Sequence, residues 1–199
     1  MNVNAPIAPA EIQGVVAAEV ERQLKAFRGE MEGKLAEVRE RTVDDAATII
    51  VFSDELDKVL AAFVLATGAA AAGLKTSMFF TFWGLSALKK KDASGGPKNI
   101  MERMFALMTP SSTESLPTSK MNYFGMGALM LRKMMKDKQI ATLEELVALA
   151  RELDVKFIAC TMSMDAMGVS QAELMDGLTY GGVATYMADA VRSRVTLFV

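Results

Sequence analysis

Short, largely apolar runs separated by longer helix-like stretches constrain the fold of this sequence more than any other feature. The runs AATIIVF at 46–52, KTSMFFTF at 75–82 and VKFIAC at 155–160 are rich in β-branched or aromatic residues, which is typical of strands covered on both faces. A fourth strand is expected at 195–199. Because helical stretches alternate with these strands, we expect parallel pairing within an α/β layered fold. A fifth strand would have to lie in the methionine-rich middle of the chain.

Hydrophobic periodicity and capping residues predict the helices. Ser53 or Asp54 is expected to cap a helix that runs to about residue 73, and TLEE at 142–145 places a hydroxyl cap three residues before a glutamate. The lysines of KKKDASGGPK at 89–98 are expected in a loop, either solvated or attracting an anionic sulfur species or an acidic partner. The remaining predicted helices span 98–108, 126–136, 142–153, 171–178 and 182–191.

Residues 10–41 are predicted to form one long polar helix with a single apolar stripe. The stripe has spacings of 4, 4, 4, 3, 4, 4 and 3, which are close to a heptad. Such a helix could pack on its own domain or coil with another copy, and the spacing favours self-association, although Gly29 and Gly33 lower the helix propensity. We therefore expect a helical extension over 1–45 and an α/β domain over 46–199. The stripe consists of Ile12, Val16, Val20, Leu24, Phe27, Met31, Leu35 and Val38.

The absence of histidine narrows the possible chemistry. The 199 residues include no histidine and one cysteine, Cys160, which excludes a Ser-His-Asp triad, a Cys-His dyad, a histidine-ligated metal and an intramolecular disulfide. A net charge of −2, from 22 basic and 24 acidic residues, argues against nucleic-acid binding. The uncharged stretch 59–74 is shorter than the roughly 20 apolar residues of a spanning helix, and we expect no secretory signal at the N-terminus. We expect a cytoplasmic protein for which membrane contact is not favoured.

Three segments that follow predicted strands define a candidate site. Ligands of open parallel sheets bind beyond the carboxyl ends of the strands, so SDELDK at 53–58, WGLSAL at 83–88 and CTMSMD at 160–165 are expected to meet. No GxGxxG follows the first strand and no GxxxxGK[ST] is present, so no nucleotide cofactor is expected. The residues expected on this rim are Ser53, Asp54, Trp83, Gly84, Cys160, Thr161 and Ser163.

Cys160 has two interpretations. A thiol at the end of a strand, before a turn into a helix, can meet backbone N–H groups that stabilise its thiolate, although Asp165 would oppose this if it pointed inward. Alternatively, Cys160 is a buried structural residue, because free cysteines are among the most buried side chains. The neighbouring Met162 is expected to serve packing or partner binding rather than Cu(I) ligation. The same is expected of methionines that share one face of the helix at 126–136, namely Met126, Met130 and Met134.

Several longer strings resemble the DsrE/DsrF-like sulfur-relay family. They are SDELDK, AAFVLATGAAAAG, TSMFFTFWGL, SKMNYFGMGALMLRKMMK, TLEELVALARELDVKFIACTMSMDAMG and DGLTYGGVATYMADA. The resemblance covers about residues 46–199, leaves out the N-terminal helix, and is closest to a branch of stand-alone small proteins sometimes described as peroxiredoxins or sulfur reductases. The lack of a second cysteine argues against an ordinary two-cysteine peroxiredoxin.

The resemblance implies a flavodoxin- or Rossmann-like parallel sheet of four to five strands with helices on both faces, in a homo-oligomer. It also implies a sulfurtransferase-like carrier, in which Cys160 accepts sulfane sulfur as a persulfide from a rhodanese-like or TusA-like protein and passes it on. Met162 and Tyr123 are expected to join the rim residues around it. The alternative is a non-enzymatic, homo-oligomeric interaction module with a structural cysteine.

Overall fold

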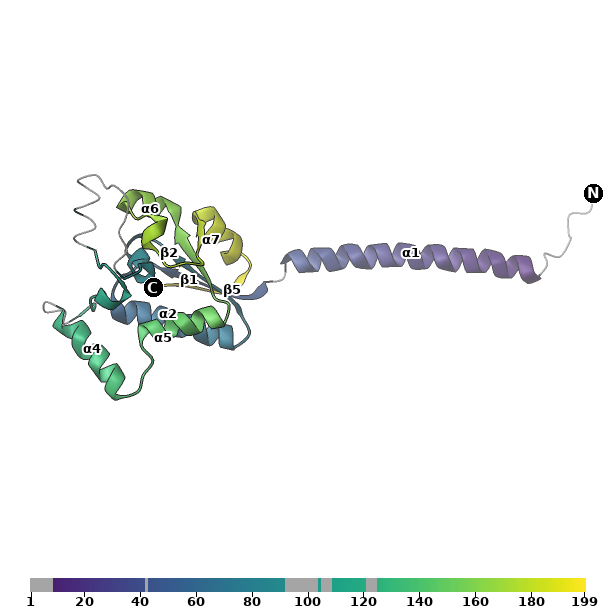
Figure 1. Cartoon of the computed structure of the whole chain (residues 1–199). Coiled ribbons are helices and arrows are strands. Elements are labelled where there is room, and N and C mark those ends of the chain that lie inside the picture. Colours follow the sequence, from purple (N-terminus) through teal and green to yellow (C-terminus); the bar gives the residue numbers. More distant parts are fainter. Residues whose placement is uncertain (1–8, 42, 92–103, 105–108, 121–124) are drawn as a thin grey trace, which may run out of the picture. The chain divides into compact units, whose positions relative to one another are not determined.

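The computed structural model describes residues 9–41, 43–91, 104, 109–120 and 125–199 (Figure 1). Contacts divide the chain into two compact units, Met1–Thr42 and Val43–Val199. The described residues of the first unit form one long helix, α1 (Pro9–Arg41). Nowhere in the described part of the chain does a helix have the length and apolar character needed to cross a bilayer.

The second unit contains a five-stranded parallel sheet with the strand order β4-β3-β2-β1-β5. The four predicted strands are confirmed with small shifts at their ends. The additional strand lies at 179–181 and not in the methionine-rich middle. It directly follows the residues 171–178, for which the sequence predicted a helix. A strand of three residues is too short to show a period of its own. The strands are β1 (Asp44–Val51), β2 (Lys75–Phe80), β3 (Lys156–Cys160), β4 (Thr179–Gly181) and β5 (Ser193–Phe198).

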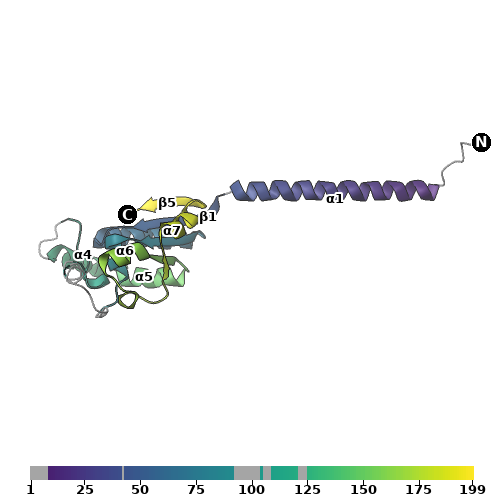
Figure 2. The same cartoon turned by 90° about the horizontal axis from the view of Figure 1, so that it is seen from above.

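Helices cover both faces of the sheet, as predicted (Figures 1 and 2). Helices α2 (Leu56–Ala71) and α5 (Leu143–Glu152) lie on one face, and α7 (Val183–Ala190) lies on the other. The capping box predicted at 142–145 is present, since the Thr142 side chain accepts from the Glu145 N–H. The other elements are α4 (Met126–Asp137), α6 (Thr161–Met167) and the 3₁₀ helices η1 (Phe82–Leu88), η2 (Thr113–Ser115) and η3 (Gln171–Glu173).

Several local predictions need correction. The N-cap of α2 is Glu55, not Ser53 or Asp54. The turn expected between the third strand and the next helix is absent from the described structure, because α6 starts directly after Cys160. Lys89, expected in a solvated loop, is 8% exposed, and its Nζ donates to the Thr109 hydroxyl and to the Pro110 carbonyl at 3.1 Å each. The helix predicted at 98–108 lies outside the described residues except for residue 104. Three methionines were predicted to serve either core packing or partner binding on one face of α4. They are exposed, so the core alternative is wrong and partner binding stays a prediction: Met126, Met130 and Met134.

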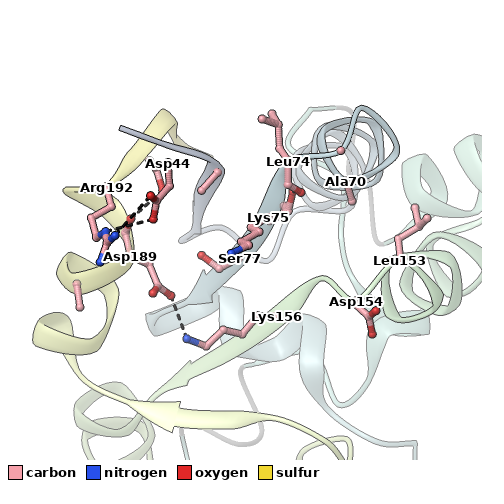
Figure 3. A pocket seen from close by; sticks show the side chains of 15 residues that line it. Asp44, Ala70, Leu74, Lys75, Ser77, Leu153, Asp154, Lys156, Asp189 and Arg192 are labelled. Carbon is pink, nitrogen blue, oxygen red and sulfur yellow. Dashed lines mark hydrogen bonds and ion pairs between the residues drawn. The ribbon is translucent and has the colours of Figure 1, made fainter. Parts of the chain in front are cut away.

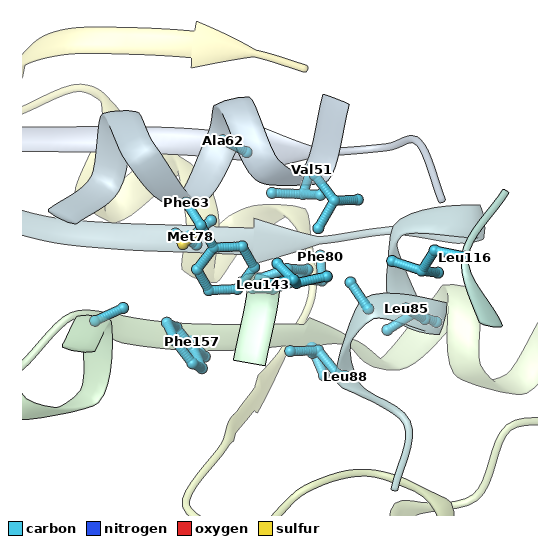
Figure 4. Close-up of a cluster of buried hydrophobic side chains, with 14 of the residues drawn as sticks. Val51, Ala62, Phe63, Met78, Phe80, Leu85, Leu88, Leu116, Leu143 and Phe157 are labelled. Carbon is cyan, nitrogen blue, oxygen red and sulfur yellow. The ribbon is translucent and has the colours of Figure 1, made fainter. Parts of the chain in front are cut away.

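The main core lies between the sheet and the helices α2 and α5 (Figure 4). Phe63 of α2 meets two aromatic rings of the sheet, with centroid distances of 6.0 Å to Phe80 and 5.6 Å to Phe157. Side chains alternate between the faces of a strand, so the neighbours Phe79 and Ile158 point to the opposite face. There they form a smaller cluster with Cys160 and Tyr186. The candidate thiol therefore belongs to the α7 side of the sheet.

A close backbone contact joins the end of β1 to η1. The Gly84 N–H donates to the Phe52 carbonyl at 2.8 Å, and the Thr81 N–H donates to the Val51 carbonyl at 3.1 Å. A Cβ atom at position 84 would lie 2.1 Å from the Val51 carbonyl oxygen. Glycine is therefore required at this position, and the contact fixes where η1 leaves the sheet.

Gly84→Ala should lower the free energy of unfolding by about 2 kcal/mol or more, because backbone atoms must move to admit the methyl group. Gly68→Ala is the matched control, since a Cβ at this position in α2 meets nothing within 4 Å. It should raise stability by about 0.5–1 kcal/mol. Urea denaturation of both variants measures the difference, and equal stability of the two variants would contradict the contact.

Candidate functional site

The strand register brings four residues to one level at the carboxyl edge of the sheet. Val51 pairs with Phe80, and Phe80 pairs with Ala159. One residue further along these strands are Phe52, Thr81 and Cys160, and Cys160 itself pairs with Gly181 of β4. We call Phe52, Thr81, Cys160 and Gly181 the edge row. Adjacent members come from strands about 5 Å apart, so Cys160 lies between Thr81 and Gly181.

Cys160 ends β3 and is the N-cap residue of α6, with extended backbone angles of φ −72° and ψ 111°. The first N–H groups of a helix have no acceptor within the helix, so those of Thr161, Met162 and Ser163 have none inside α6. The residue is 3% exposed and packs in the cluster that contains Phe79 and Tyr186. The thiol thus combines an apolar environment with a helix start.

A pair of hydroxyl groups ties the end of β2 to α6. The Thr81 Oγ1 and Ser163 Oγ atoms lie 2.9 Å apart and share a hydrogen bond, and Ser163 is fully buried. This bond holds the first turn of α6 beside the edge row. The sequence reading included Ser163 but missed Thr81, which it placed inside the second strand.

Gly181 allows α7 to approach the sheet beside Cys160. A Cβ atom at Gly181 would lie 2.5 Å from the Thr185 hydroxyl oxygen, so a larger residue would push the first turn of α7 away. The sequence reading missed Gly181 and Tyr186 as neighbours of the candidate thiol, and Thr185 as the residue that packs on Gly181. The string TYGG was an available signal, since paired glycines after a β-prone pair often mark a close backbone approach.

The other predicted rim residues lie at the same edge but differ in exposure. Thr161, Met162 and Trp83 are exposed, with Met162 at 61% and Trp83 at 39%. Ser53 makes local contacts, since its hydroxyl donates to a Glu55 carboxylate oxygen at 3.0 Å and accepts from the Glu55 N–H. Tyr123 lies outside the described residues.

An exposed aromatic group lies at the β1 and β5 end of the same edge. The Phe52 ring lies 5.8 Å from the rings of both Phe82 and Phe198, and these three side chains are 38%, 38% and 68% exposed. We call Phe52, Phe82 and Phe198 the aromatic trio. The strand order reverses at this point, between β1 and β5, so the reversal is two strands away from Cys160 rather than beside it.

Asp54 is a half-buried carboxylic acid at this edge. Burial disfavours the ionised form and raises the pKa of Asp54, although its own backbone N–H and the nearby Lys89 and Lys58 partly oppose the shift. The pKa of Asp57 shifts in the opposite direction. Burial opposes its ionisation, but hydrogen bonds from the Ser119 side chain and N–H lower the pKa of Asp57.

A cavity of about 510 Å³ lies at the opposite, amino-terminal edge of the sheet (Figure 3). Its lining includes three acidic and three basic side chains. Lys156 pairs with Asp189 at 3.0 Å and Arg192 pairs with Asp44 at 3.1 Å. None of the predicted rim residues lines this cavity, and its balanced charges favour neither an anionic nor a cationic ligand. Within the described ranges, no three side chains of His, Cys, Asp or Glu gather into a metal-binding group.

The Thr81–Ser163 hydrogen bond should give a coupling energy of about 1 kcal/mol in a double-mutant cycle of Thr81→Val and Ser163→Ala. Either single change should also speed alkylation of Cys160 in the native protein, because the first turn of α6 is held less tightly. Urea denaturation and native alkylation rates measure the two effects. Thr161→Ala removes an exposed hydroxyl from the same turn and should change neither. If the loss of unfolding free energy in the double variant equals the sum of the losses in the two single variants, the coupling is disproved.

Asp54→Asn should alter the pH dependence of stability. The folded protein holds the Asp54 proton more tightly than the unfolded chain, so wild-type stability should fall relative to the variant as pH rises from about 4. Asp57→Asn should show the reverse sign, because ionised Asp57 is favoured in the folded state and wild type gains stability over that variant as pH rises. Urea denaturation between pH 3 and pH 7, roughly the range over which carboxyls titrate, tests both, and slopes of equal sign would refute the assignment.

Comparison with known proteins finds a matching family and two sequence relatives. Residues 43–198 match the DsrE/DsrF/DrsH-like family. The chain is 43% identical over 152 residues to the uncharacterized protein YrkE of Bacillus subtilis, covering 76% of this chain and 95% of YrkE. It is 36% identical over 156 residues to the sulfur carrier protein DsrE2 of Allochromatium vinosum, covering 76% of this chain and 96% of DsrE2.

Among solved structures, the ychN protein of E. coli matches 77% of this chain and 98% of its own length, with 11% identity and a TM-score of 0.48. The family match spans nearly all of the second unit, and the two sequence relatives align over almost their entire lengths. The resemblance found in the sequence is therefore confirmed, and this chain belongs to the DsrE/DsrF-like family.

Proposed function

We propose that this protein is a sulfur carrier that holds sulfane sulfur as a persulfide on Cys160 and relays it between partner proteins. The observation that carries the proposal is the position of Cys160, the only cysteine in the sequence, at the carboxyl edge of the sheet and directly before α6. A relative with 36% identity is named a sulfur carrier protein, which supports the same chemistry.

The transfer needs one thiolate and no proton shuttle. The Cys160 thiolate attacks the outer sulfur of a donor persulfide, a new S–S bond forms at Sγ, and the donor S–S bond breaks to release the donor thiolate. An acceptor thiolate then attacks the same outer sulfur and releases the Cys160 thiolate. Each step exchanges one S–S bond for another, so no external oxidant or reductant is consumed. A chain without histidine can carry out both steps.

The first turn of α6 is the proposed source of anion stabilisation. The N–H groups of Thr161, Met162 and Ser163 would interact with the charge on the thiolate and on the terminal persulfide sulfur. The Thr81–Ser163 hydrogen bond supports this role, because it fixes the turn that presents these groups.

The burial of Cys160 bears on how the sulfur arrives. At 3% exposure, the residue is poorly accessible, so a donor must displace part of the rim before its sulfur reaches Sγ. We assign docking of a rhodanese-like or TusA-like protein to the exposed apolar side chains of the same edge, namely the aromatic trio, Trp83 and Met162. A reactive single thiol also suits a reducing compartment, so we place the protein in the cytoplasm. Its resemblance to the DsrE/DsrF-like family leads us to propose a homo-oligomer as well.

Intact-mass spectrometry of the reduced protein after incubation with polysulfide or thiosulfate tests the proposal. Wild type should gain the mass of one sulfur atom, and dithiothreitol should remove it. Cys160→Ser should gain nothing under the same conditions. The absence of an adduct on wild type with polysulfide, thiosulfate and a persulfidated donor protein would overturn the proposal, as would the same adduct on Cys160→Ser.

A non-enzymatic interaction module is the second candidate, and the 3% exposure of Cys160 favours it. In that case Cys160→Ser should leave the cellular phenotype unchanged, and no sulfur donor protein should accelerate labelling of the thiol. The carrier proposal requires instead that a donor increase the labelling or sulfur loading of native Cys160.

A further inference from the structure

The apolar stripe of α1 repeats with a period of eleven residues. Phe27, Met31 and Leu35 each follow an apolar residue eleven positions earlier, and the spacing 4, 4, 3 runs through both triplets. All six side chains are between 48% and 59% exposed. We call these six residues the α1 stripe: Val16, Val20, Leu24, Phe27, Met31 and Leu35.

An eleven-residue period differs physically from the heptad that the overall spacing suggested. Eleven residues make three turns at about 3.67 residues per turn, close to the 3.6 of a straight helix, whereas a heptad requires a left-handed supercoil. A heptad through Leu24, Phe27 and Met31 would next place Lys34 in the stripe, but the chain places Leu35 there. The stripe therefore stays on one face of a nearly straight helix over about 30 Å.

Two glycines within the length of the stripe, Gly29 and Gly33, lie away from it. Gly29 is two residues from both Phe27 and Met31, which is about 200° around the helix. Gly33 has the same relation to Met31 and Leu35. A Cβ at either glycine would meet nothing within 4 Å. The glycines lower the helix propensity without interrupting the apolar face.

The charges of α1 are mixed, with seven acidic and six basic residues. Glu19 pairs with Arg22 at 2.8 Å and Glu30 pairs with Lys34 at 2.6 Å, so acidic and basic groups lie close together along the helix. A helix that lies on an anionic membrane has a predominantly basic polar face. The mixture of signs instead suits another helix of mixed charge, because each sign can find a partner there.

We propose that α1 is an assembly helix whose stripe packs against the α1 stripe of a second copy of this chain, forming a nearly straight or weakly right-handed helix pair. A second copy offers an apolar face of the same period, length and mixed charge, and such a self-complementary face is typical of twofold contacts. Packing of this face would also supply the stability that a helix with internal glycines lacks alone. The inference is independent of the sulfur chemistry of Cys160.

Cysteine cross-linking in the full-length Cys160→Ser protein tests the proposal. Single cysteines replace Val20, Leu24 or Phe27 of the stripe, and Gly29→Cys and Gly33→Cys are the controls on the opposite face. At least one stripe cysteine should give disulfide-linked dimers at ten times or more the yield of either control, since a disulfide needs Cα atoms within about 7 Å. Equal yields, or no dimer at any stripe position, would overturn the proposal.

Two insertions test the period itself. One alanine inserted after Arg28 turns Met31 and Leu35 by about 100° relative to the four stripe residues before it and should cut the cross-linking yield at Leu24→Cys or Phe27→Cys at least fivefold. Duplication of residues 16–26 adds a full period and should preserve the yield. Unchanged dimer yield after the alanine insertion would contradict the stripe contact.

Vesicle binding tests the alternative that the α1 stripe binds a membrane surface. Full-length wild type and the pair Leu24→Glu with Leu35→Glu are sedimented with anionic phospholipid vesicles, with Gly29→Glu and Gly33→Glu as the charge-matched control. We expect no sedimentation that depends on the stripe. Binding by wild type and the control, but not by the stripe variant, would assign α1 to a lipid surface and overturn the proposal.

Discussion

Parallel pairing of β1, β2 and β3 is the constraint on which the candidate site depends. Because parallel strands end at the same edge, the register that pairs Val51 with Phe80 and Phe80 with Ala159 also aligns Phe52, Thr81 and Cys160. The Gly84 N–H bond to the Phe52 carbonyl then holds η1 against the end of β1. Segments separated by more than a hundred residues thus meet at Cys160 through backbone geometry rather than through specific side-chain recognition.

The order of strands divides this edge into two regions with different character. Around β3, the edge holds a buried thiol, a buried serine and the start of α6. Around β1 and β5, where the order reverses, it holds exposed aromatic rings. Apolar residues that remain exposed in a folded chain often mark a binding surface. In the proposed carrier, recognition and sulfur exchange would therefore occupy neighbouring parts of one edge.

The sequence was sufficient for the strands with strong apolar character and for the position of Cys160 at a strand end, because burial on both faces leaves a pattern that can be read locally. It was insufficient wherever a neighbour distant in sequence decides the outcome. The burial of Lys89 depends on acceptors at Thr109 and Pro110, and β4 exists only because β3 pairs with it. Thr81 looked like strand interior, yet its hydrogen bond to Ser163 makes it part of the site.

Burial of Cys160 is compatible with a sulfur-carrier function and would affect which thiolates can reach the persulfide. A persulfide exposed to a reducing compartment would lose its outer sulfur to any small thiolate, because exchange depends on access as well as on nucleophilicity. An apolar cluster of Phe79, Ile158 and Tyr186 around Cys160 would slow such attack and leave exchange to partners that open the rim. The same burial that makes the thiol look structural would then confer selectivity on the carrier, with the Thr81–Ser163 bond setting how readily the first turn of α6 moves aside.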